Sequence, residues 1–170
     1  MSKTYIIDRL KWYYPLELFN AFFFLGVLFY INFRYGFLNT IFISYGLGLM
    51  VFILFQGQYY WKLKLKRLTN KEFNQQTAIN LFQKFKKINI VLIILIPIPL
   101  FLQLYVNSWI IKPENLFYWA IIVNVFGILE HINYYNRQLM IDNIHDLKYL
   151  IRNRKLKIAS LKKDLDDEEL

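Results

Sequence analysis

The stretch YGFLNTIFISYGLGLMVFILFQGQYYW, residues 35–61, contains 27 consecutive positions without a charged side chain. A helix needs roughly 20 apolar residues to cross the hydrocarbon core of a bilayer, so this stretch is long enough to span a membrane. The composition of the whole chain agrees, because 56% of its residues are hydrophobic and 19% are aromatic. The sequence therefore predicts an all-α, polytopic membrane protein.

Three further stretches are predicted to span the membrane. One run of 24 uncharged residues lies between Lys87 and Lys112. Two shorter runs reach the required length only if each contains an acidic residue, Glu17 in the first and Glu130 in the last. We therefore expect a four-helix transmembrane bundle within residues 1–139 and a tail over residues 140–170. The predicted spans cover about residues 12–33, 37–60, 88–111 and 115–136, with a long connecting loop over residues 61–87.

Lysine and arginine are distributed unequally between the connections. Nineteen of the 21 lie in the N-terminal segment, in residues 61–87 and from Arg137 onward, which leaves Arg34 and Lys112 on the other side. Positively charged loops stay in the cytoplasm, so both termini are predicted to be cytoplasmic. A composition rich in Lys, Asn and Ile suggests a bacterial source and hence the bacterial inner membrane. We interpret the net charge of +9 as this topology plus attraction to anionic lipid, not as nucleic-acid binding.

The 61–87 loop is expected to contain an amphipathic helix. Thr69 and Glu72 have the spacing of a capping box, and apolar residues follow at helical spacing. This helix either lies on the membrane surface or packs on the other cytoplasmic segments. The residues expected at the lipid surface are Phe82, Lys84, Phe85, Lys86 and Lys87.

Helix interruptions are predicted at two places. Pro97 and Pro99 each lack a backbone donor and should kink the third span. In the tail, a second amphipathic helix should be interrupted at RNRKLK, residues 152–157, and resume at IASLKKDL, residues 158–165. The acidic end DLDDEEL, residues 164–170, is expected to fray.

The stretch ILEHINYYNRQL, residues 128–139, brings polar side chains into the end of the fourth span. A carboxylate that faces lipid is costly, so Glu130 should face the bundle near its inner end. Two hypotheses stay open: a clasp of hydrogen bonds between helices, or a cytoplasm-facing site for a cation, a proton or a lipid headgroup. One helix face is expected to carry Glu130, Asn133, Tyr134 and Arg137, which are spaced at i, i+3, i+4 and i+7. Other spans supply partners at the same depth. The candidate polar cluster consists of Glu17, Asn20, Gln56, Tyr60, Glu130, His131, Asn133, Tyr134 and Arg137.

No motif for catalysis or for a cofactor accompanies these residues. The chain has no cysteine and two histidines, and the adjacent Glu130 and His131 point about 100° apart on a helix. We therefore expect no metal and no cofactor. The expected function is a non-enzymatic membrane protein whose basic loop and tail engage anionic lipid or a protein partner, with a homo-oligomer as another expected association. The alternative is a small oligomeric channel or transporter with a polar mouth at Glu17, Gln56 and Glu130; a lipid-modifying enzyme ranks last.

The two halves of the chain show a weak internal similarity. VFILFQGQYYWKLKL, residues 51–65, aligns with VFGILEHINYYNRQL, residues 125–139, with identities that include Tyr60 over Tyr134. A tandem duplication would relate the first hairpin of spans to the second about an axis along the membrane normal.

Three motifs carry a resemblance to a known group of proteins. QGQYYWKLKLKRL (residues 56–68), LEHINYYNRQL (129–139) and KIASLKKDL (157–165) resemble stretches in small bacterial four-span membrane proteins of unassigned function, some of them labelled general stress protein. The resemblance covers about a third of the chain. It implies four helices in a bacterial inner membrane and no particular activity. His131 stands where that group is expected to have an aromatic residue.

Overall fold

The computed structural model describes residues 3–141 and 143–170, and the described chain is mostly helical. It contains no named strand in these residues, only a single bridge between Arg137 and Ile158. Among the described residues, four helical segments are long and apolar enough to cross a membrane, the third of them made of α3 and α4 together. The predicted all-α class is confirmed. The elements are α1 (Lys3–Tyr35), η1 (Phe37–Asn39), α2 (Ile41–Leu68), α3 (Gln75–Ile94), α4 (Pro97–Val106), η2 (Pro113–Asn115), α5 (Phe117–Tyr135), α6 (Ile144–Asn153) and α7 (Ser160–Asp166).

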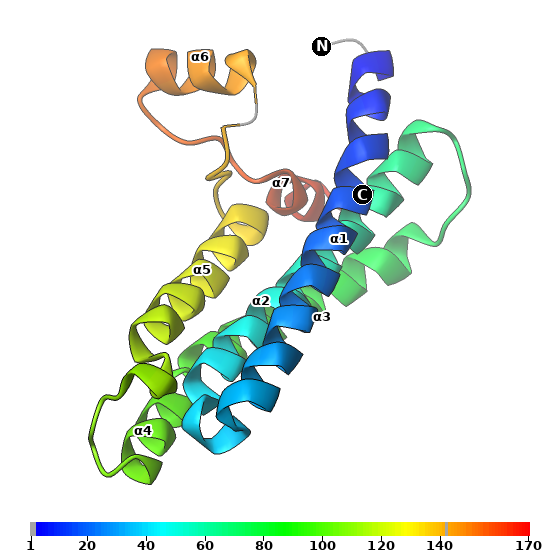
Figure 1. Cartoon of the computed structure of the whole chain (residues 1–170). Helices are drawn as coiled ribbons and strands as arrows, with labels where there is room; N and C mark the ends of the chain where they lie inside the picture. The colour runs from blue at the N-terminus through cyan, green and yellow to red at the C-terminus, as the bar shows by residue number, and fades with distance from the viewer. Residues whose placement is uncertain (1–2, 142) are drawn as a thin grey trace.

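The long helices run back and forth along one common direction (Figure 1). The start of α1, the connection from α2 to α3, and the tail helices α6 and α7 lie at one end, which we call the tail end. The connections from α1 to α2 and from α4 to α5 lie at the opposite end, the far end. A helix of 33 residues is about 50 Å long, more than the roughly 30 Å of a hydrocarbon core, so α1 extends beyond the apolar region.

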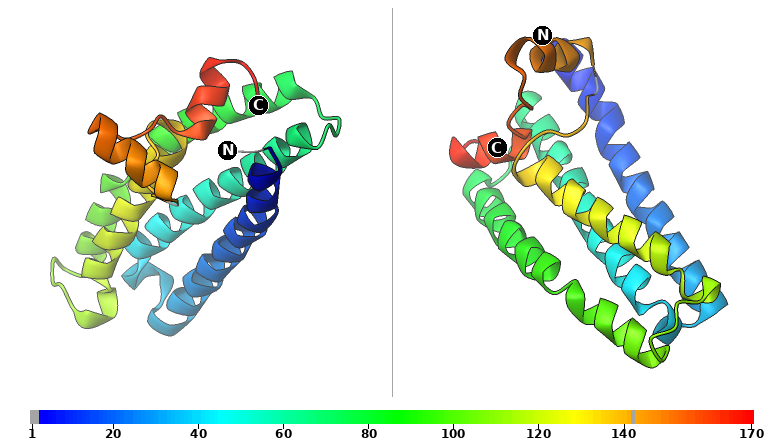
Figure 2. Two further views of the ribbon diagram at one scale, coloured as in Figure 1. Left: turned by 90° about the horizontal axis from the view of Figure 1, so that it is seen from above. Right: turned by 90° about the vertical axis from the view of Figure 1, so that its left-hand side faces the viewer.

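Helix α2 lies at the centre of the molecule. In the most apolar window of each span, 67% of residues are buried in α2, against 11% in α1, 17% in α3–α4 and 28% in α5. Helix α2 packs along α1 and α5, and Figure 2 shows α3 on the side of α2 away from α1. The spans thus surround one central helix.

The arrangement does not reproduce the symmetry that a tandem duplication would give. Helices α1 and α2 of the first hairpin pack along each other, whereas α3 and α5 of the second meet only locally. Helix α5 therefore does not occupy a position equivalent to that of α2. The expected relation of the two hairpins about an axis along the membrane normal is wrong for their packing.

Glycines allow α2 and α5 to approach each other closely. A Cβ atom on Gly46 would lie 2.7 Å from the side-chain amide nitrogen of Asn124, and a Cβ atom on Gly57 would overlap the ring and hydroxyl of Tyr134. The Asn124 amide donates to the carbonyls of Phe42 and Ala120, at 3.0 and 2.8 Å. Small residues at helix contacts in membranes permit such close packing and interhelical hydrogen bonds.

The third span breaks at the predicted prolines. Helix α3 ends at Ile94 and α4 begins at Pro97, so the kink is confirmed. At the far end, Gln103 of α4 connects the start of α2 to η2. Its side chain accepts a hydrogen bond from the Phe42 amide at 2.9 Å and donates one to the Asn115 carbonyl at 2.9 Å.

The start of α3 differs from the sequence prediction. Helix α2 continues to Leu68, and the cap of α3 is Asn74, whose side chain accepts from the Thr77 amide at 2.9 Å. The capping box predicted at Thr69 and Glu72 is therefore wrong, because α2 continues past the predicted span end at residue 60 to Leu68, and Thr69 is its C-cap.

The aromatic stripe of α3 packs inside the protein. Phe82 is completely buried between α2 and α7, and Phe85 is half-buried against Phe82 and Phe52. The prediction that Phe82 lies at the lipid surface is corrected, because side chains of α2 and α7 bury it, whereas Phe85 is only half-buried. Lys84 and Lys87 are exposed, and Lys86 is partly exposed.

The tail forms two helices with an interruption between them, as predicted. Its acidic end does not fray, however. Leu170 is completely buried in the core that includes Phe82 and Leu161, and Asp164 is 7% exposed. Arg67 donates to the carbonyl of Glu169 at 2.9 Å. The end of the chain is therefore docked against α2 and α3.

Candidate functional site

A hydrogen bond between Glu17 and Tyr134 connects α1 to α5. The Tyr134 hydroxyl donates to the Glu17 carboxylate at 2.6 Å. Tyr134 is 5% exposed, and its ring lies against Gly57 of α2. A carboxylate inside a span needs such a donor, because lipid offers none. The clasp that the sequence led us to expect around Glu130 is therefore formed by Glu17.

Glu130 and its neighbours occupy different environments from one another. Glu130 and Asn133 are half-buried, while Arg137 is exposed beyond the last residue of α5. Asn133 accepts a hydrogen bond from the Leu139 amide at 2.8 Å, which turns the chain away from the helix axis. The expected face that combines Glu130, Asn133, Tyr134 and Arg137 is corrected at Arg137, because the helix ends before that residue.

His131 and Asn20 do not join the Glu17–Tyr134 pair in the described contacts. His131 is 6% exposed and stacks on Tyr135, with ring centroids 5.1 Å apart. It therefore packs as an aromatic residue would. Asn20 is half-buried in α1.

Gln56 belongs to a separate buried network. Its side-chain amide exchanges two hydrogen bonds with Asn89 of α3, at 2.8 and 2.9 Å, and accepts a third from the Tyr135 hydroxyl at 2.8 Å. Gln56 is 3% exposed and Asn89 is completely buried. This network links α2, α3 and α5. Of the three residues expected at a polar mouth, Glu17 lines the cavity described below, and Gln56 and Glu130 do not.

Tyr60 takes part in the docking of the tail. The Tyr60 hydroxyl donates to Asp164 of α7 at 2.6 Å, and the Lys64 ammonium lies 2.8 Å from the same carboxylate. Lys64 also donates to the Tyr60 hydroxyl at 2.8 Å and to Ser160 at 3.3 Å. The three donors of this ammonium are thus engaged. Lys64 holds α7 against α2.

Asp146 organises the segment between α5 and α7. Its carboxylate accepts from Lys157 at 2.6 Å, from Asn143 at 2.8 Å and from Gln138 at 3.0 Å. Burial of Asp146 acts to raise the pKa of this carboxyl group, but the hydrogen bond and positive charge of Lys157 outweigh burial and hold the pKa below its usual value. Asp146 is therefore ionised and enclosed by donors at neutral pH.

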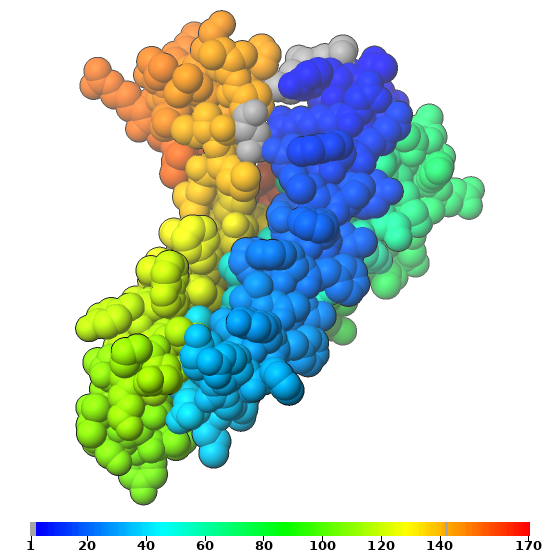
Figure 3. Space-filling view, viewed as in Figure 1, coloured from blue at the N-terminus to red at the C-terminus, as the bar shows by residue number. Residues whose placement is uncertain are grey.

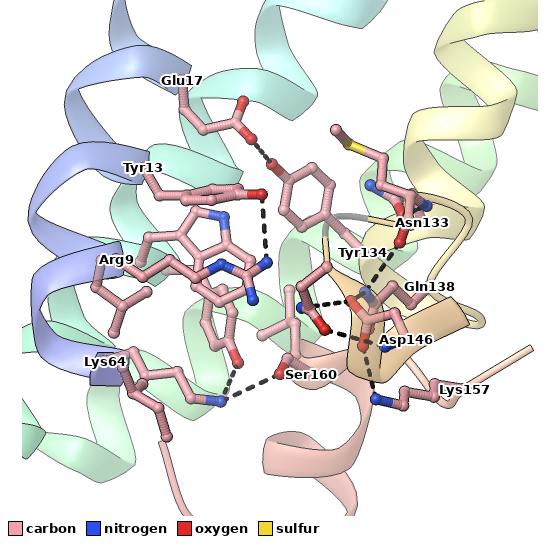
Figure 4. Close-up of a pocket in the computed structure, with 17 residues that line it drawn as sticks. Arg9, Tyr13, Glu17, Lys64, Asn133, Tyr134, Gln138, Asp146, Lys157 and Ser160 are labelled. Carbon is pink, nitrogen blue, oxygen red and sulfur yellow. Dashed lines mark hydrogen bonds and ion pairs between the residues drawn. The ribbon is translucent and has the colours of Figure 1, made fainter. Parts of the chain in front are cut away.

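These elements surround a cavity of about 310 Å³ at the tail end, which we call the tail-end pocket (Figure 4). Figure 4 shows the Glu17–Tyr134 hydrogen bond at one end of the view and Lys64, Ser160 and Lys157 at the other. Cations from three segments line the pocket, namely Arg9, Lys64 and Lys157. Apolar walls come from Ile6, Leu10, Trp61, Met140 and Leu161. The pocket is therefore amphipathic.

The sequence prediction missed several of these residues. Lys64 lies in the predicted basic loop, Asp146 and Asp164 lie in the predicted tail, and Asn89 lies at the start of the predicted third span. One signal was available: polar residues at apolar-face positions of an amphipathic helix, such as Asn89 in α3, indicate buried partners. For Asp146 and Asp164, spacing in the sequence carries no such signal, because their partners lie on other segments.

Four apolar helices of this length are compatible with a multi-pass integral membrane protein. Comparison with protein-family models, with curated proteins and with solved structures gave no match for this chain. The functional argument therefore rests on the site itself.

Proposed function

We propose that this chain is a non-enzymatic integral protein of a bacterial inner membrane, with both termini in the cytoplasm, that engages anionic lipid through its tail end. The observation that carries this proposal is the distribution of charge over the fold. Nineteen of 21 Lys and Arg residues belong to three segments, and Figure 1 places these segments at one end. The N-terminal segment and the tail stand beside each other there in Figure 3.

Electrostatics explains why this end would prefer anionic lipid. A Lys or Arg near an anionic membrane surface contributes about 1 kcal/mol of attraction, and the attraction falls off within a Debye length. Lys84 and Lys87 are exposed on α3, and Phe82 on the same helix is buried by protein contacts. These lysines would therefore contact headgroups at the level where α3 leads into the third span.

The non-enzymatic part of the proposal rests on the sequence. Nucleophile–base motifs, glycine-rich phosphate loops and metal-ligand spacings do not occur in it. The resemblance to small bacterial four-span proteins supports the proposed location, although it supports no activity.

The test is the lipid that co-purifies with the protein from native membranes. Lys84→Gln with Lys87→Gln removes two exposed charges at the tail end, and Arg34→Gln with Lys112→Gln removes two at the far end as a matched control. We expect the tail-end variant to retain a smaller ratio of phosphatidylglycerol to phosphatidylethanolamine than the wild type, and the control to match the wild type. An equal ratio in all three proteins, or no enrichment of anionic lipid in the wild type, would contradict the proposal.

A further inference from the structure

We propose that two copies of this chain associate in the membrane through one face of α1, with Gly26 at the point of closest approach. Every exposed residue of α1 between positions 19 and 33 belongs to this face, which we call the α1 aromatic face. Its members are Phe19, Phe22, Phe23, Gly26, Phe29, Tyr30 and Phe33. The inference goes beyond the proposed function and takes from it only that the chain spans a membrane in one orientation.

The α1 aromatic face is open in the single chain. Helix α1 packs along α2 on its other side, and Figure 3 shows α1 uncovered along the face of the molecule that is turned to the viewer. Only 11% of the most apolar window of α1 is buried, the lowest share of the four spans. A partner in the membrane therefore has access to the whole length of this face.

The composition of the α1 aromatic face differs from that of another exposed surface of the spans. Six of its seven residues are aromatic. Of the ten exposed large hydrophobic residues between Ile88 and Val106 on α3 and α4, eight are aliphatic. Aromatic belts belong to the membrane–water interfaces, whereas Phe22 and Phe23 lie in the middle of the predicted span over residues 12–33. Aromatic side chains are enriched at protein interfaces, and their ring pairs add to the contact energy. The face therefore fits a protein partner better than acyl chains.

The spacing on this face is that of a seam between two helices. Successive positions of the seam lie three, four, three and four residues apart, at Phe19, Phe22, Gly26, Phe29 and Phe33. A repeat of 3.5 residues keeps the same side chains against a partner helix along the whole contact. Contact with fluid acyl chains requires no such register, whereas contact with a second helix does. The seam therefore indicates a helix as the partner.

Gly26 lies at the centre of the seam. A Cβ atom there would meet nothing within 4 Å among the described residues, unlike Gly46 and Gly57, which lie against α5. Glycine weakens a helix relative to alanine, and small residues allow helices in a membrane to approach each other closely. A second helix at Gly26 supplies the close contact that the single chain does not.

The membrane determines the symmetry of such a pair. Two copies inserted with the same orientation are parallel, so a closed dimer has its two-fold axis along the membrane normal. Each position of the seam then lies opposite the same position of the other copy, and Gly26 of one copy meets Gly26 of the other. The partner helix is therefore α1 of a second copy, because only then does the seam face its own repeat.

Rings of the α1 aromatic face are already held in place before association. Phe22 packs edge to face against Phe55 of α2, with ring centroids 5.7 Å apart. Phe19 stacks on Phe23, with ring centroids 6.5 Å apart. Side chains that are ordered beforehand lose less entropy when a partner binds. The face is therefore preorganised for contact.

Cross-linking tests the seam directly, because the sequence contains no cysteine and a single introduced thiol reports one contact. Phe22→Cys and Phe29→Cys each place a thiol on the seam. Phe126→Cys is the control on α5, where Phe126 is 53% exposed, close to the 56% of Phe22. The full-length proteins are oxidised in native membranes and separated on a non-reducing gel. A disulfide needs Cα atoms about 4.4–6.8 Å apart, so we expect linked dimers from the two seam variants and few from Phe126→Cys.

A second variant separates association from folding. Gly26→Leu adds a side chain where the single chain leaves space for a Cβ atom, so the melting temperature in detergent should not fall. The same side chain blocks the close approach of two copies. Energy transfer between labelled copies in lipid vesicles should show association weakened by about tenfold or more. Phe126→Leu introduces the same residue at an exposed position of α5 and should leave association unchanged.

The outcomes separate this inference from the proposed function. Equal cross-linking of all three cysteine variants would show random collision, and cross-linking of Phe126→Cys alone would show contact through another face; either result would overturn the α1 interface. Association of Gly26→Leu at the wild-type level would overturn it as well. Alkaline extraction of the membranes checks the shared premise. Release of the wild-type protein by this treatment would contradict the proposed membrane insertion itself, whereas a retained protein without seam cross-links would contradict the dimer alone.

Discussion

Within the spans, α2 and α5 meet where glycines lie against Asn124 and Tyr134, whereas at the tail end α2 holds α7 through Lys64, Asp164 and a core of buried aromatic and aliphatic side chains. The difference follows from the surroundings. Lipid is as apolar as leucine, so helices in a membrane gain from close backbone contact and hydrogen bonds. Water at the tail end makes burial of Phe82 and Leu170 favourable in itself.

The largest effect is expected from loss of the Asp164 carboxylate. Asp164→Ala leaves the Lys64 ammonium without its anion in a site where the Lys64 side chain is 16% exposed. Removal of one partner from a buried pair costs about 3–5 kcal/mol, enough to release α7 from α2. Limited proteolysis of the tail measures this release. The control is Asp166→Ala, whose carboxylate is 57% exposed and pairs with Lys162, and it should leave the tail protected.

The next effect is expected inside the spans. Gly57→Ala places a methyl group where Tyr134 now lies, and overpacking of this kind costs about 1–3 kcal/mol. The melting temperature of the detergent-solubilised protein should fall. Gly48→Ala on the same helix is the matched control, because a Cβ atom there meets nothing within 4 Å. Equal melting temperatures for the two variants would show that α2 and α5 do not depend on this close approach.

A smaller effect is expected from the hydrogen bond that joins α1 to α5. Glu17→Leu leaves the Tyr134 hydroxyl without its acceptor, and interhelical hydrogen bonds in membranes contribute about 0.6–1.7 kcal/mol. Glu17→Gln keeps an acceptor and should unfold at a temperature close to that of the wild type. Glu130→Leu should cost less than Glu17→Leu, because both carboxylates are half-buried but, among the described contacts, Glu17 is the one that accepts a hydrogen bond from another helix. If Glu130→Leu lowers the melting temperature more than Glu17→Leu does, Glu130 and not Glu17 forms the clasp.

The smallest effect is expected on acidification. The pKa of Asp146 is held below its usual value of 3.8, so its contribution to stability is present above about pH 4 and is lost as the pH falls through the lower pKa of the folded state. Hydrogen exchange of α6 should therefore accelerate in that range. Asp146→Asn should remove this step and exchange faster at neutral pH as well. A wild-type α6 that exchanges at the same relative rate from pH 6 to pH 3 would contradict the assignment.

The candidate site was predictable only in part. Glu17, Gln56, Tyr60 and Tyr134 were identified because polar residues in apolar helices need partners, and each has a partner in the structure. Their pairing was not predictable. Glu17 lies near the middle of α1 and Glu130 near the end of α5, and only the packing of the helices brings Glu17 to the Tyr134 hydroxyl. The partnership of Lys64 with Asp164 spans 100 residues of sequence.

The sequence by itself determined the helical class, the number of spans and the segregation of charge. Uncharged runs of spanning length leave few alternatives, because lipid satisfies no backbone hydrogen bond and imposes helices. Only the tertiary structure decided that α2 is the central helix, that α3 packs its phenylalanines inward and that the acidic end of the tail is docked. Hydropathy does not identify the central helix, because the most apolar span, α3–α4, is only 17% buried. The glycines of α2 and the close packing that they permit decide its central position.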